Sequence, residues 1–120
     1  RVAVRDATVP ILTEGEYECS DPFLNWVFQT GKATTQACLP DIWVDCPWRE
    51  QGAYIGDTLV EFHTTRALSS DLSVMKRALE VWAQSQNDDG QMPCCAPAWY
   101  RRAHADFSLI YILAVRDFAR

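Results

Sequence analysis

Residues 72–82 carry the pattern that most constrains what this chain can fold into. Apolar side chains recur there every three or four residues, which is the spacing of one face of an α-helix. They form two adjacent stripes, the first made of Leu72, Met75, Leu79 and Trp82 and the second of Val74, Ala78 and Val81. Two adjacent stripes give a wide apolar face, so this predicted helix needs neighbours on more than one side.

Two further helices are predicted before this segment. Ser20 and Asp21 supply an N-cap, Pro22 follows at the first helical position, and helical spacing of apolar residues continues to about Leu39. Asp57 opens the second of these helices. Residues 69–71 (Ser-Ser-Asp) predict a tight turn and the cap of the helix over 72–82, so these two helices form a hairpin.

The segment from Asp106 onward is apolar almost all round. A buried strand would fit its first half, but Ala114 and Phe118 continue at helical spacing, so a buried helix is favoured. The longest apolar stretch, residues 107–115, has less than half of the roughly 20 residues that cross a bilayer. We therefore expect a buried helix and no membrane partner.

Long segments rich in aromatic residues separate these helices. Prolines and glycines interrupt helical spacing over residues 40–56 and again over 87–104, and both segments carry Trp and Tyr. Residues 1–18, with Val2, Val4, Val9 and Ile11, predict an edge strand or an extended lead-in that belongs to an upstream β region. The predicted fold is all-α, an array of antiparallel helical hairpins whose long loops gather at one end as a binding face.

Charge and cysteine content exclude several kinds of partner and site. The net charge is −5 and no run of Lys or Arg is present, which argues against nucleic acid as a partner. The five cysteines show no zinc-ligand spacing, and their odd number leaves at least one thiol unpaired in any disulfide scheme. We therefore expect no metal and no cofactor. Reduced thiols fit a reducing compartment such as the bacterial cytoplasm.

Residues 45–57 concentrate the groups that bind and cleave sugars. Three carboxylates, one guanidinium and two aromatic rings occur within thirteen residues. Aromatic faces stack on pyranose rings, charged groups bind their hydroxyls, and a pair of carboxyl groups performs acid and base catalysis on a glycosidic bond. A structural reading stays open, in which Asp45 pairs with Arg49, Asp57 caps its helix and Trp48 is core.

These residues resemble a family signature. The string Asp-Cys-Pro-x-Arg-Glu at 45–50 with Gly-Asp at 56–57 resembles that of bacterial α-L-rhamnosidases, and residues 86–93 and 106–109 resemble two later segments of the same family. The resemblance implies that residues 19–120 form the first part, about a third, of an (α/α)₆ six-hairpin catalytic domain. It also implies inverting hydrolysis of terminal α-L-rhamnosides. The expected partners are the rhamnoside substrate and the remainder of that domain.

The resemblance also implies roles for individual residues. Asp45, Arg49 and Asp57 match positions that bind the sugar, and Tyr54 stands where many members have a Trp wall. The family's general acid commonly stands two residues after the Arg, where this chain has Gln51, whose amide cannot donate that proton. Glu50 is then the candidate acid, since burial between Trp48 and Tyr54 would raise its pKa.

Three more residues carry structural or functional predictions, and two other functions compete with that of an active hydrolase. Trp99, in the second long loop, is a further candidate wall of the sugar site. For His63 a core position is preferred, and for His104 a hydrogen bond within its loop, over metal or acid and base roles. The rival to an active hydrolase is a catalytically inactive carbohydrate-binding relative, which Gln51 favours. A helical interaction module is disfavoured because no repeat period appears.

Overall fold

The computed structural model describes residues 2–3, 8–10, 14–99 and 101–120, and within them it contains four helices and no strand. The helices are α1 (Pro22–Ala37), α2 (Ile55–Leu68), α3 (Ser73–Gln84) and α4 (Ala105–Phe118). The all-α prediction is confirmed. Val4 and Ile11 lie outside the described residues, so the predicted edge strand is not tested there.

Local sequence signals account for the helix boundaries. Asp21 is the N-cap of α1, its Oδ1 accepts a hydrogen bond from the Phe23 N–H at 2.8 Å, and Pro22 occupies the first turn. α2 begins two residues before Asp57, with Tyr54 at its N-cap. The start of α3 was predicted one residue early. Leu72 is its N-cap, although the Asp71 side chain accepts the Ser73 N–H at 2.8 Å.

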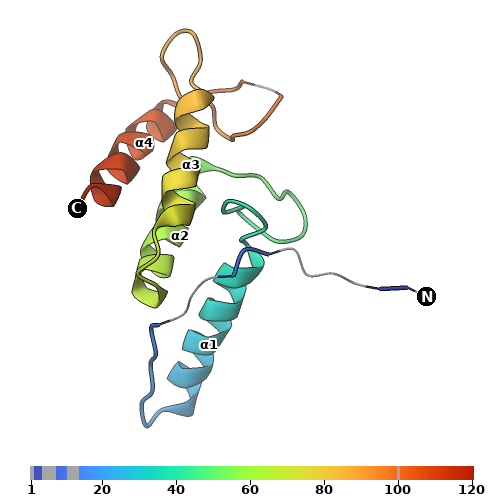
Figure 1. The fold of residues 1–120 in the computed structure, drawn as a ribbon, viewed down its shortest axis with the longest axis vertical. Coiled ribbons are helices and arrows are strands. Elements are labelled where there is room, and N and C mark those ends of the chain that lie inside the picture. The colour runs from blue at the N-terminus through green and yellow to red at the C-terminus, as the bar shows by residue number, and fades with distance from the viewer. Residues whose placement is uncertain (1, 4–7, 11–13, 100) are drawn as a thin grey trace.

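The chain forms a thin slab with principal extents of 52 × 46 × 22 Å. α2 and α3 form the predicted hairpin, α4 packs against both of them, and α1 packs against α2 from the other side (Figure 1). A helix with its side chains is about 10–12 Å wide, so a 22 Å slab leaves most helices open on one face. Among the described residues, no helix has both the length and the apolar character needed to cross a membrane.

α3 lies at the centre of the hydrophobic core. Met75, Ala78, Leu79 and Trp82 are buried, and Val74 and Val81 pack partly buried beside them. Loop segments cover this wide face together with α4, through Leu39, Ile42 and Trp43 on one side and Met92 and Ala96 on the other. The predicted width of the face is confirmed. The predicted need for neighbours on more than one side is also confirmed, because α4 and the two long loops pack over this face.

α4 is the predicted helix but is buried on one side only. Its inward residues, Phe107, Ile110, Tyr111, Ala114 and Phe118, pack against the core, and the Tyr111 hydroxyl donates to the Leu79 carbonyl at 3.1 Å. Its outward residues Leu109 and Ile112 are 64% and 62% exposed. Ala114 is its one fully buried residue, so the prediction of burial all round is wrong for this chain.

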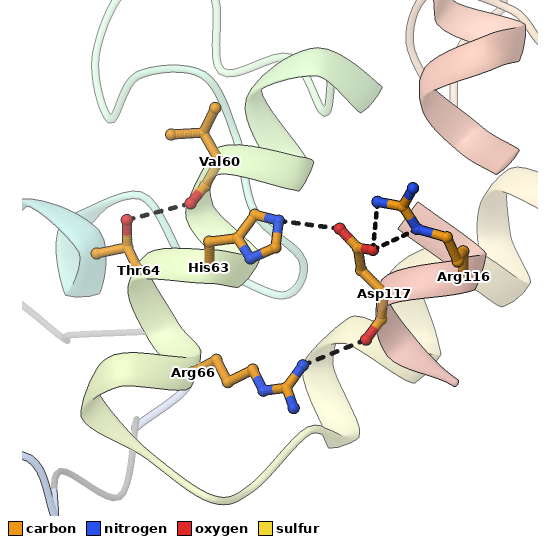
Figure 2. Close-up of polar contacts among 6 residues, drawn as sticks. All are labelled: Val60, His63, Thr64, Arg66, Arg116 and Asp117. Atoms are coloured by element: carbon orange, nitrogen blue, oxygen red, sulfur yellow. Dashed lines mark hydrogen bonds and ion pairs between the residues drawn. The ribbon is translucent and has the colours of Figure 1, made fainter. Parts of the chain in front are cut away.

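A polar cluster joins α2 to the end of α4 (Figure 2). His63 Nε2 lies 3.2 Å from Asp117 Oδ2, Arg116 Nε donates to Asp117 Oδ1 at 2.7 Å, and Arg66 donates to the Asp117 carbonyl at 3.3 Å. The His63 side chain is 53% exposed, so its predicted core position is wrong. It forms part of the polar edge of the α2–α4 contact. The His104 ring packs 5.3 Å from that of Phe107, and no side-chain capping bond is present at this N-cap.

Candidate functional site

The two long loops meet beside the N-terminus of α2, as the sequence predicted. Tyr54, the last residue of the first loop, forms an isolated antiparallel β-bridge with Cys95 of the second loop. The Ala96 N–H donates to the Ala53 carbonyl at 3.1 Å. Tyr54 is half-buried, and a Cβ added to Gly52 would lie 2.5 Å from its ring. A larger residue at position 52 would therefore displace the Tyr54 side chain, while the Tyr54 backbone links the two loops.

Asp45 closes the first loop. Its Oδ1 accepts the Gly52 N–H at 2.8 Å, and its own N–H donates to the Gly52 carbonyl at 3.0 Å. Partial burial acts to raise the pKa of Asp45, but hydrogen bonds from Cys46, Gly52 and Glu50 outweigh it and hold the pKa below its ordinary value. Asp45 is therefore an ionised acceptor, fixed in position by the loop that it closes.

A cavity of about 500 Å³ lies next to Asp45, between the C-terminal end of α1, the first turns of α2 and the start of α4. Asp45 and Asp57 both line it, so the structure brings together two of the predicted sugar-binding carboxylates. Burial, followed by the charge of Asp45, raises the pKa of Asp57, although a hydrogen bond to its own backbone acts in the opposite direction. The remaining lining residues are Thr34, Thr35, Cys38, Gly56, Val60, Glu61 and Phe107.

The other predicted site residues lie outside this cavity. Arg49 and Glu50 form an ion pair with each other on the exposed side of the loop, with side chains 82% and 42% exposed. Glu50 remains close enough to Asp45 to lower the pKa of that carboxyl. Trp48 is 89% exposed. The expectation that Glu50 is buried between Trp48 and Tyr54 is therefore wrong in this chain, because Trp48 points to solvent and Tyr54 lies under the loop.

Gln51 and Trp99 also lie outside the cavity. Gln51 adopts a left-handed backbone with φ 51°, and its side-chain amide donates to the Pro47 carbonyl at 2.8 Å. That amide therefore stabilises the turn of its own loop. Trp99 is 95% exposed in the second loop, next to Tyr100, which lies outside the described residues.

Glu61 is a site residue that the sequence analysis did not single out. It lies one helical turn after Asp57 and lines the same cavity. Burial, with further contributions from the charges of Asp57 and Asp45, raises its pKa to about 8. The signal available in the sequence was its spacing, since residues four apart on a helix share a face. Spacing alone did not show that this face is desolvated.

The described residues offer no place for a metal ion, since no group of three His, Cys, Asp or Glu side chains among them is arranged to bind one. The five cysteines are free thiols. Cys38 lines the cavity, where burial first and the charges of Glu61, Cys46 and Asp45 next raise the pKa of its thiol. A raised pKa keeps this thiol in its neutral, weakly reactive form.

Comparison with known proteins identifies the family. The model of the bacterial α-L-rhamnosidase six-hairpin glycosidase domain matches residues 13–117. The chain belongs to this family. It is also similar to the crystal structure of a GH78 family rhamnosidase of Bacillus sp. GL1, with 27% identity over 93% of the chain and a TM-score of 0.85. The chain spans 12% of the length of that enzyme. Comparison with curated proteins gave no match.

Membership in the family confirms the resemblance noted from the sequence and the six-hairpin character of the fold. The four helices are thus a set of hairpins related to those of a rhamnosidase domain, and the chain is part of a glycoside hydrolase family that acts in carbohydrate metabolism.

Proposed function

We propose that this chain is the first part of an inverting six-hairpin catalytic domain that releases terminal α-L-rhamnose from rhamnosides. Residues 1–18 would lead in from an upstream β region, and residues 19–120 would form the first hairpins. The observation that carries the proposal is the pairing of Asp45 and Asp57 on one cavity wall in a chain of this family. Two carboxylates on the wall of one cavity can accept hydrogen bonds from adjacent sugar hydroxyls.

In this proposal Glu50 is the general acid. Glu50 lies on the loop that carries Asp45, close enough to lower the pKa of that carboxyl, and in the proposal it gives its proton to the glycosidic oxygen that leaves the bound sugar. Arg49, Trp48, Tyr54 and Trp99 would complete the substrate contacts. The carboxylate that activates water would come from the remainder of the same domain, and no metal or cofactor takes part.

Turnover of 4-nitrophenyl α-L-rhamnoside by the full-length protein tests this function. We expect Glu50→Gln to lower kcat by about 10²-fold or more with L-rhamnose binding retained, because a general acid acts only in the transition state. Asp45→Ala should weaken binding as well. Glu80→Gln is the matched control, since Glu80 is an exposed carboxylate on α3 that forms an ion pair with Lys76 at 3.9 Å and lies outside the cavity. Wild-type turnover in Glu50→Gln would show that the proton comes from elsewhere.

The second candidate function is a catalytically inactive carbohydrate-binding relative. The exposure of Glu50 and its ion pair with Arg49 favour this alternative, because a general acid works best when it is desolvated and protonated. Binding of L-rhamnose with no turnover by the full-length protein would establish the alternative. Turnover that releases β-L-rhamnose first, observed by proton NMR, would exclude it and establish inversion.

A further inference from the structure

Glu61 is a half-buried residue for which the proposed mechanism has no role. Its Oε2 is closed off from solvent and has no hydrogen-bond partner in the part of the chain that the structure describes. The side chain nevertheless forms part of the wall of the cavity shared by Asp45 and Asp57. A carboxylate oxygen that is desolvated without a partner is costly, which favours the neutral acid at this position.

The groups that face Glu61 strengthen this preference. From α2 it faces Asp57, from the first loop Asp45, and from the end of α1 the Cys38 thiol. The residue that α4 places on the cavity is Phe107, which carries no charge. No positive charge lowers the pKa of Glu61, and two guanidinium groups of the described residues are paired elsewhere, Arg49 with Glu50 and Arg77 with Asp41. Thus no described cation offsets a third negative charge in the cavity, and the pKa of about 8 agrees with that geometry.

The cavity also lacks a strong side-chain hydrogen-bond donor. The hydroxyl of Thr34 donates to the Thr30 carbonyl at 2.8 Å, and that of Thr35 donates to the Gly31 carbonyl at 3.0 Å. Asp45 is an ionised acceptor. A sugar hydroxyl both donates and accepts hydrogen bonds, so Asp45 and Asp57 alone would satisfy half of the capacity of a hydroxyl placed between them. A neutral carboxylic acid would supply the missing donor.

We propose that Glu61 forms part of the sugar site as a neutral carboxylic acid that donates a hydrogen bond to a hydroxyl of the bound sugar, while Asp45 and Asp57 accept. This inference rests on the proposed function and deepens it by adding a binding residue. The proton stays on Glu61 throughout, so no proton transfer to the substrate is involved. Ionisation of Glu61 at alkaline pH removes the donor and adds a charge beside two carboxylates, and sugar binding weakens.

Calorimetric titration of L-rhamnose into the full-length protein at pH 6.5 and pH 9 tests the inference. We expect the wild-type dissociation constant to rise about 10-fold between these pH values, because Glu61 loses its hydrogen-bond donor when it ionises. Glu61→Gln keeps a donor that cannot ionise, so its affinity should stay within about 3-fold of wild type at pH 6.5 and be independent of pH. Glu61→Ala should bind about 10-fold more weakly at pH 6.5. Glu80→Gln should keep the wild-type profile.

Several results would overturn the inference. An alkaline loss of affinity that persists in Glu61→Gln would assign the titration to another group. Equal losses in Glu61→Gln and Glu61→Ala at pH 6.5 would show that an ionised carboxylate is required, and wild-type affinity in Glu61→Ala would show that Glu61 has no role. Binding that follows the expected profile without hydrolysis would support Glu61 while the catalytic part of the proposed function fails. Failure of the wild-type protein to bind L-rhamnose would refute both.

Discussion

Replacement of the outward apolar residues of α4 is the prediction that tests the architecture most directly. Leu109 and Ile112 lie three residues apart on the face opposite the core and are 64% and 62% exposed, with Leu113 beside them at 39%. The open end of α1 adds Phe23 and Trp26, which are 63% and 61% exposed. Large exposed apolar residues gathered on a helix face mark an interface. We expect residues 1–120 expressed alone to self-associate through it.

The exposures give the size of the effect. Complete burial of a Leu or Ile side chain contributes about 1.5–3 kcal/mol, so covering the exposed part of Leu109 or Ile112 contributes roughly 1–2 kcal/mol each. In a two-fold pair both copies contribute, which gives about 4–8 kcal/mol before the cost of association. Leu109→Gln with Ile112→Gln should therefore weaken self-association by about 100-fold or more.

Sedimentation velocity from about 1 to 100 μM, with binding of an apolar dye measured in parallel, follows this change. Val2→Gln is the matched control, since Val2 is 96% exposed in the lead-in and away from α4. A wild-type chain that sediments as a monomer, melts in one sharp transition and takes up no dye would refute the reasoning. It would show that residues 1–120 form a complete domain whose exposed residues need no partner.

Two further predictions concern the packing of α2. Gly15→Ala should lower the unfolding free energy of the full-length protein by about 1–3 kcal/mol, because a Cβ there would lie 2.3 Å from the Ala67 carbonyl oxygen. The control is Gly31→Ala, which has open space around it and should be neutral or stabilising. Equal urea midpoints for the two variants would contradict this prediction. The hydrogen bond from Arg116, helped by His63, lowers the pKa of Asp117, so its stabilising effect is complete above about pH 4 and is lost as the pH falls through the lowered value. Asp117→Asn should accordingly lower the stability of the protein in urea at pH 7 and match wild type near pH 2. Asp88→Asn, in an exposed turn, is the control. A stability difference that does not depend on pH would assign the effect to packing.

The helices could be predicted because their signals are local. Asp21 and Pro22 fix the start of α1 within one turn of helix, and the two stripes of residues 72–82 identify the wide face of α3. The position of the neighbours could not be predicted in the same way. α3 is covered by Trp43 and Met92, which lie about thirty and ten residues from its ends, and no local pattern pairs those loops with that helix.

The candidate site could likewise be predicted only in part. The spacing of Asp45 and Asp57 in a family signature predicted that both lie in one site, and the structure places both on one cavity. Desolvation was predicted for the wrong glutamate. Glu50 has aromatic neighbours in the sequence but is exposed, whereas Glu61 has its desolvating neighbours in α1 and α4. Burial of a carboxyl group depends on contacts between elements, and sequence neighbours do not report it.

Exposed residues of the first loop and exposed apolar residues of α1 and α4 favour the same interpretation, that a further part of the domain packs against both. Glu50, Arg49 and Trp48 belong to the loop that carries Asp45, but they are exposed and none of them contributes to the wall of the cavity. A sugar site encloses most of its ligand, and a general acid needs a desolvated carboxyl, so these described residues provide only part of such a site. The later hairpins of a six-hairpin domain would cover α1 and α4 and could close this wall. The packing of these hairpins on α1 and α4 would then determine both stability and catalysis. The Leu109→Gln, Ile112→Gln variant of the full-length protein should therefore lose turnover, although neither residue lines the cavity.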